Sequence, residues 1–289
     1  MSTVNNAASL PGKKLHDGMI KSRKTRAGDL VIALICLIAM LICLLPMVHV
    51  LACSLSSADA LVRNDVFLWP KGWNVEAYKT VMTTEKYVRS LGWTAVLTVI
   101  CTLLSLFLTI CTAYPLIYPN LRGGKVINFI ILFTMYFSAG TIPSYILLNN
   151  IHFLNTPWAL IVPNCISVFN VIIMRSFFYG VPDSLREAAE IDGANDRQIF
   201  FRITIPNLRT ILTYTLVTSL IGGLSMYDIP KMLNNGNPNN STLTATMFIY
   251  NQAFQNSYMY ARGAAASMIL FLIIAFFSAI IFFMMRDRK

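Results

Sequence analysis

The chain has 289 residues, of which 56% are hydrophobic and only 12% are charged. A soluble domain carries about 25% charged residues, so this composition excludes an ordinary soluble protein and predicts one that crosses a membrane several times. The formal net charge of +10 does not indicate nucleic-acid binding, because the charges lie between apolar blocks and not on one face. All six cysteines lie within apolar blocks without a C-x-x-C pair, so neither a zinc site nor a disulfide framework is expected.

The chain begins with a polar, basic arm at residues 1–28. Six apolar blocks follow, each near the ~20 residues that an α-helix needs to cross a bilayer. Their expected bounds are 29–53, 90–117, 126–149, 157–179, 207–227 and 263–285. The sequence therefore predicts an all-α membrane domain over 29–289, with six transmembrane helices.

The basic residues are distributed unevenly between the two sides of such a membrane domain. With the N-terminus inside, sixteen of the 23 lysines and arginines fall on the inner side and seven on the outer side. Cytoplasmic segments carry an excess of basic residues. Both termini and the polar segment 181–206 are therefore expected to be cytoplasmic.

The third and fourth apolar blocks contain helix-breaking and polar residues. Glycine and proline in the stretch 140–145 predict a bend, which a membrane tolerates only where protein or a water-filled cavity satisfies the backbone. The fourth block is interrupted by Pro163 and carries Asn164 and Asn170. Because amides are costly in lipid, both should face the bundle interior, either as bonds between helices or as ligand contacts.

The fifth block ends at Tyr227 and Asp228, where a solvated carboxylate is the simplest interpretation of Asp228. The outer loop that follows is rich in turn-forming residues between 233 and 242. By itself this pattern is typical of an ordinary surface loop.

The segment 181–206 reads VPDSLREAAEIDGANDRQIFFRITIP and resembles a short helix followed by a turn. Ser184 and Glu187 have the spacing of a capping box at a helix start. The Asp192-Gly193 pair predicts the end of that helix, because glycine tolerates the left-handed conformation. Pro206 suits the first turn of the next helix. These features alone favour a plain surface loop and a docking element equally.

The residue types and spacing of this segment resemble the EAA loop of ABC-importer permeases. The match comprises Glu187-Ala188-Ala189, then Gly193, then Ile205-Pro206, and the form EAAEIDGA is similar to the carbohydrate-uptake, maltose-type branch. Ile205 stands where many members have leucine. A second match, D-x-P…N-G-x-P-x-x-S-T…Y-x-x-A-F, runs from Asp228 to Phe254. The resemblance implies that this outer loop contacts the sugar-binding protein, and an ordinary surface loop is the equally weighted alternative.

The resemblance implies the type I importer permease fold, in which a cytoplasmic coupling helix docks into a separate ATPase. It implies coupling roles for Glu187, Ala188, Ala189, Asp192, Gly193 and Pro206. A sugar pathway would run past the polar and aromatic residues Asn164, Asn170, Tyr227 and Asp228. This chain would hold no cofactor, metal or catalytic residue, since ATP and Mg would bind the ATPase.

The same resemblance implies an assembly in the bacterial plasma membrane. Its partners would be a second, homologous permease in a heterodimer, two copies of the ATPase and an extracellular sugar-binding protein. The absence of a G-x-x-x-x-G-K-[ST] motif agrees with ATP binding elsewhere.

An alternative interpretation is a secondary, ion-coupled transporter without an ATPase. Intramembrane carboxylates or a pair of broken inverted repeats would favour it, and neither is apparent. A membrane enzyme is a third class, which the lack of a Ser/His/Asp set or an intramembrane carboxylate pair disfavours.

Overall fold

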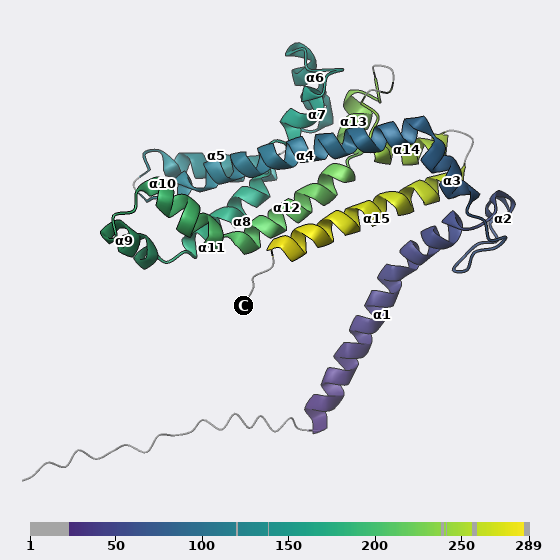
Figure 1. Ribbon diagram of the computed structural model, residues 1–289, viewed down its shortest axis with the longest axis horizontal. Coiled ribbons are helices and arrows are strands. Elements are labelled where there is room, and N and C mark those ends of the chain that lie inside the picture. The colour runs from purple at the N-terminus through teal and green to yellow at the C-terminus, as the bar shows by residue number, and fades with distance from the viewer. Residues whose placement is uncertain are drawn as a thin grey trace, which may run out of the picture. The chain divides into compact units, whose positions relative to one another are not determined.

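The computed structural model (Figure 1) describes residues 23–285, apart from 120, 138, 238, 239, 241 and 256–258. Most of the basic arm predicted at 1–28, and both termini predicted to be cytoplasmic, lie outside the described residues. Those residues form helices and loops, with no strand among them. The all-α prediction is confirmed.

The chain divides into two units, residues 1–48 and residues 49–289. In the first unit, the described residues belong to α1 (Arg23–Ser54), which continues into the second unit. From Gly28 to Met47 every side chain of α1 is exposed. An apolar helix of this length, exposed on all sides, fits a bilayer-spanning segment.

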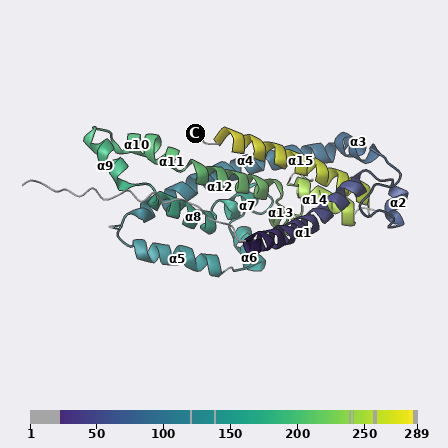
Figure 2. The same cartoon turned by 90° about the horizontal axis from the view of Figure 1, so that it is seen from below.

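Three long helices dominate the second unit: α4 (Glu85–Ala113), α12 (Arg209–Leu224) and α15 (Tyr260–Met285). Figures 1 and 2 both show them side by side. Short helices lie in the connections between them, namely α2 (Ala58–Val62), α3 (Glu76–Thr83), α13 (Asp228–Leu233), α14 (Ala245–Tyr250) and a π-helical turn at Asn251–Gln255. A 3₁₀ turn at Pro115–Ile117 extends α4.

Two predicted spans are broken helices. α5 (Gly124–Tyr136) and α6 (Thr141–Asn150) meet at a bend of 117°. α7 (Trp158–Ile161), extended by a 3₁₀ turn, meets α8 (Val168–Tyr179) at 41°. Among the described residues, four helices are long and apolar enough to cross a membrane, or six spans if each bent pair counts as one.

The bend between α5 and α6 follows from the local sequence. Gly140, with φ +84° and ψ −179°, adopts a conformation that is essentially restricted to glycine. α6 then starts at Thr141, so that Pro143, which lacks an N–H, falls in the first helical turn where no donor is needed. The Gly/Pro pattern thus produces the break that it predicts.

Small and polar residues join α4 to its neighbours. A Cβ atom on Gly223 of α12 would lie 2.6 Å from Cγ2 of Thr98 on α4, so only glycine permits this approach. The Tyr87 hydroxyl of α4 donates a hydrogen bond to the Ala266 carbonyl of α15 at 2.9 Å. The Ala245 N–H donates to Thr94 Oγ1 at 2.9 Å. These contacts make α4 the central support of the second unit.

Candidate functional site

The segment 181–206 forms α9 (Asp183–Ile191), α10 (Asp196–Ile199), a π-helical turn at Phe200–Thr204 and α11 (Ile205–Asn207). Figures 1 and 2 place α9 and α10 at one end of the bundle and α2 and α3 at the other. As predicted, Pro206 lies in the first turn of α11. The segment is thus a helical loop at one end of the second unit.

The capping box predicted at Ser184 and Glu187 is wrong. α9 begins two residues earlier, with Pro182 at the N-cap, and the N-cap makes no side-chain hydrogen bond. Proline fixes φ near −65°, and with ψ at 130° Pro182 ends the extended chain immediately before Asp183. A capping box occurs instead at α10, where Asn195 and Gln198 exchange two bonds of 2.9 Å. The sequence N-x-x-Q carried that signal.

α9 ends as the Asp192-Gly193 pair predicts. Gly193 has φ +81°, in the left-handed region. Its N–H donates to the Glu190 carbonyl at 3.1 Å, and the Ala194 N–H donates to the Ala189 carbonyl at 2.9 Å. These two bonds form a Schellman motif, which satisfies carbonyls that a helix end leaves free. Gly193 therefore fixes the direction in which the chain leaves α9.

The two faces of α9 differ. Ala189 is buried, whereas Glu187 and Ala188 are exposed. Ile191, at the end of the helix, is 87% exposed. Glu187 makes no hydrogen bond or ion pair within the described part of the chain. The exposed face thus offers apolar surface and the carboxylate of Glu187.

Arg186 holds α9 against the loop after α4. Its guanidinium lies 5.9 Å from the centre of the Tyr118 ring and its Nε lies 3.6 Å from Glu190 Oε1. A hydrogen bond with Tyr118 is the main cause that raises the pKa of Arg186 above its usual value. The side chain is therefore a permanent cation, and it links α9 to Tyr118.

An aromatic cluster continues this link into the bundle. Tyr114, at the end of α4, has ring-centre distances of 5.6 Å to Tyr118, 5.4 Å to Phe178 of α8 and 4.9 Å to Phe200. The Tyr118 hydroxyl donates to the Tyr114 oxygen at 2.8 Å. The cluster joins α4, α8 and the loop 181–206. The cluster was not predicted, although Tyr114 and Tyr118 have helical spacing next to a loop expected to be cytoplasmic.

A polar cavity of about 350 Å³ lies between α4, the start of α8 and α12. The described residues that line it carry no charge, and they supply hydroxyl, amide and aromatic groups. They are Cys101, Thr102, Ser105, Asn164, Ser167, Phe169, Asn170, Tyr214, Thr218, Ser219, Gly222, Gly223 and Met226. Donors, acceptors and ring faces without formal charge suit a neutral polyol.

The structure brings together two of the four residues predicted along the sugar pathway. Asn164 and Asn170 line the cavity, whereas Tyr227 and Asp228 do not. Tyr227 packs on Tyr250 with ring centres 4.9 Å apart, and Asp228 is exposed at the start of α13. Asn164 Nδ2 donates to the Leu160 carbonyl at 2.7 Å, within its own turn, so its Oδ1 remains available to a ligand.

The residues of α12 that line the cavity were not predicted. Tyr214, Thr218 and Gly222 recur every four residues and so share one face of the helix, and Met226 follows beyond the helix end. That spacing is visible in the sequence. This face of α12 was not predicted to line a cavity, because Gly222 and Thr218 are also typical of ordinary helix packing.

A family model described as "Binding-protein-dependent transport system inner membrane component" matches residues 30–289. The polygalacturonan/rhamnogalacturonan transport system permease protein YtcP of Bacillus subtilis is 39% identical over 194 residues, which cover 67% of this chain and 68% of that protein. The multiple sugar-binding transport system permease protein MsmF of Streptococcus mutans is 28% identical, covering 71% and 78% of the two chains.

Among solved structures, a chain of a bacterial ABC transporter involved in the import of the acidic polysaccharide alginate superimposes with a TM-score of 0.78. It is 27% identical, and the match covers 90% of this chain and 97% of that one. The predicted importer fold is therefore confirmed. The chain belongs to the family of inner-membrane components of binding-protein-dependent transport systems.

Proposed function

We propose that this chain is one permease subunit of an ATP-driven, binding-protein-dependent importer of an oligosaccharide. The observation that carries the proposal is the uncharged polar cavity beside α4 and α12, whose amides, hydroxyls and aromatic rings suit sugar hydroxyls and ring faces. Relatives named for polygalacturonan, multiple-sugar and starch-product transport support the substrate class. The family does not favour the ion-coupled alternative.

In this proposal the loop 181–206 couples the permease to a separate ATPase, which binds ATP and Mg. Glu187 and Ala188, on the exposed face of α9, contact the ATPase. Ala189 is buried and packs α9 against the rest of this chain. Asp192 and Gly193 set the end of α9, and Pro206 starts the return to the bundle. The Tyr114 cluster then carries the movement to α4 and α8.

The remaining partners are a second, homologous permease, a second copy of the ATPase and an extracellular sugar-binding protein. Both termini and the loop 181–206 are assigned to the cytoplasm of a bacterial cell, on the basis of the basic-residue asymmetry. Asn237→Cys in a cysteine-free background should react with a membrane-impermeant maleimide on intact cells, and Asp196→Cys should not. The reverse pattern contradicts the orientation.

The function is tested by uptake of a panel of labelled oligosaccharides into cells that make the complete transporter. We expect uptake that depends on this chain and on ATP, and an ATPase that co-purifies with it in detergent. Replacing both cavity amides, by Asn164→Ala and Asn170→Ala, should raise the half-saturation concentration about tenfold, since each lost hydrogen bond costs ~0.5–1.5 kcal/mol.

The control variant is Asn149→Ala, an exposed amide on α6 outside the cavity, which should transport like the wild type. Wild-type half-saturation in the double variant would limit the two asparagines to a structural role. Uptake of no glycan in the panel would refute the function itself.

A further inference from the structure

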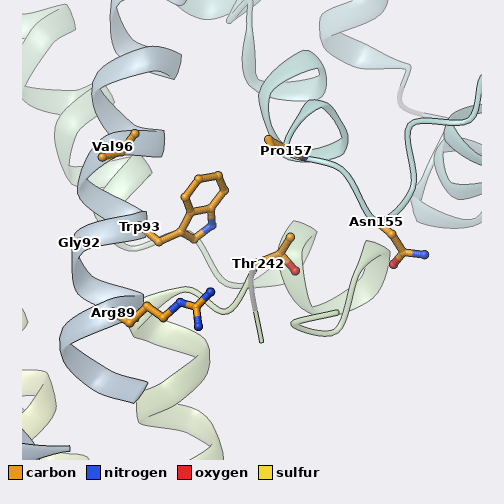
Figure 3. Close-up of a pocket in the computed structure, with 7 residues that line it drawn as sticks. All are labelled: Arg89, Gly92, Trp93, Val96, Asn155, Pro157 and Thr242. Atoms are coloured by element: carbon orange, nitrogen blue, oxygen red, sulfur yellow. The ribbon is translucent and has the colours of Figure 1, made fainter. Parts of the chain in front are cut away.

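A second cavity, of about 510 Å³, opens beside the first part of α4 (Figure 3). Arg89, Gly92, Trp93 and Val96 of α4 line it together with Asn155, Pro157 and Thr242. It shares no lining residue with the polar cavity. Arg89 lies near the start of α4, whereas Tyr114 and the loop 181–206 lie at the other end, so this cavity is on the side proposed to face outward.

Charge distinguishes this cavity from the first. Arg89 is exposed and makes no ion pair or hydrogen bond with any residue that the structure describes. The described lining contains no carboxylate. A guanidinium that lacks a protein partner presents a planar array of donors that matches a carboxylate in two parallel bonds.

The walls around Arg89 supply apolar surface and further hydrogen-bonding groups. Figure 3 shows Arg89 and Trp93 projecting from the same side of α4 toward Thr242 and Asn155. The Trp93 ring packs against a core that includes Leu97, so it is a fixed wall. Its Nε1 is buried without a hydrogen-bond partner in the described part of the chain, which leaves one donor unsatisfied at the cavity.

Hydrogen bonds fix the Asn155 backbone and the Thr242 side chain, which lie opposite α4. The Asn155 N–H donates to Asn234 Oδ1 at 3.1 Å, and the Thr242 hydroxyl donates to the Asn237 carbonyl at 2.7 Å. The Thr242 oxygen can still accept a bond, and the Asn155 amide can donate and accept. The cavity thus combines one cation, two neutral polar groups and an apolar wall.

We propose that this cavity binds a carboxylated sugar unit, a uronic acid residue of the transported oligosaccharide. The carboxylate pairs with Arg89, sugar hydroxyls contact Asn155 and Thr242, and the C–H face of the ring lies on the apolar wall. A lone cation beside apolar surface fits this amphipathic anion better than a free phosphate, for which several converging donors are typical. The assignment rests on the proposed function and narrows its substrate class.

The test uses two probes of matched size, trigalacturonate and its fully methyl-esterified form, which lacks the negative charges. Uptake is measured in cells that make the complete transporter with wild-type chain, Arg89→Gln or Arg89→Lys. Arg89→Gln should raise the half-saturation concentration for trigalacturonate about tenfold and leave that of the ester unchanged. Arg89→Lys should give an intermediate value, because a lysine keeps the charge and loses the paired geometry.

Lys86→Gln is the matched control, because Lys86 is an exposed cation on the same helix that does not line the cavity. Equal effects of Arg89→Gln on both probes, or no effect on trigalacturonate, would overturn the assignment. A wild-type transporter that imports only neutral glycans overturns it too, while the proposed function stands. Only the failure to import any glycan counts against the proposed function.

Discussion

Gly193→Val is expected to abolish most glycan-stimulated ATP hydrolysis and uptake while the chain still inserts in the membrane. A Cβ at Gly193 would meet no atom within 4 Å, so the defect comes from the backbone and not from a clash. At φ +81° a side chain costs ~1–2 kcal/mol, and a β-branched one more. Relief of that strain disrupts the Schellman motif and turns α9 away from its docking direction.

Two variants separate this effect from general strain. Gly123→Val places the same side chain at φ +78°, also in open space, in a loop outside 181–206, and should keep at least half of wild-type stimulation. Gly193→Asn should recover most activity, because asparagine tolerates the left-handed region. ATPase activity and uptake are measured on the assembled transporter. Normal stimulation in Gly193→Val, with the ATPase still bound, would show that the loop does not couple the two proteins.

Gly222→Trp is expected to reduce uptake to background without loss of thermal stability. Gly222 lines the polar cavity, and a Cβ built on it meets nothing within 4 Å. A large side chain therefore projects into open space of about 350 Å³ that the sugar would need. Uptake at the wild-type rate in this variant would mean that sugar does not pass through the cavity.

At the neighbouring glycine, Gly223, a substitution is expected to lower the stability of the protein. At Gly223 a Cβ would lie 2.6 Å from Thr98 Cγ2 and 2.8 Å from Thr98 Oγ1, in the packed contact between α12 and α4. Gly223→Ala should lower the free energy of unfolding by roughly 1–3 kcal/mol, the usual cost of overpacking. Thermal unfolding in detergent compares the two variants, and equal melting temperatures would contradict the packing that separates these glycines.

Hydropathy was sufficient to predict the helical membrane fold, because long apolar blocks have few other stable solutions. The helix break before α6 was equally predictable from the sequence, since Gly140 and Pro143 act on the backbone locally. The start of α9 could not be predicted in this way. Ser184 and Glu187 have the spacing of a capping box, and only the conformation of Pro182 moves the helix start to Asp183.

The polar cavity is formed by segments that are distant in the sequence, and only part of its lining was predicted. Asn164 and Asn170 were predicted because an amide within an apolar block needs a polar environment. Tyr227 and Asp228, at the end of the next span, were grouped with them because the family resemblance places both spans at the pathway. The chain leaves the helical path at Ser225 and restarts at Asp228, which carries both residues beyond the cavity.

The aromatic cluster at Tyr114 also bears on how the transporter assembles. With Arg186 seated on Tyr118 and Phe200 packed on Tyr114, α9 is held in a defined position before any partner arrives. A surface that is already ordered loses little conformational entropy when it is bound. Capture of the ATPase would therefore not wait for a folding step, and the permease would present the same contact surface at each successive encounter.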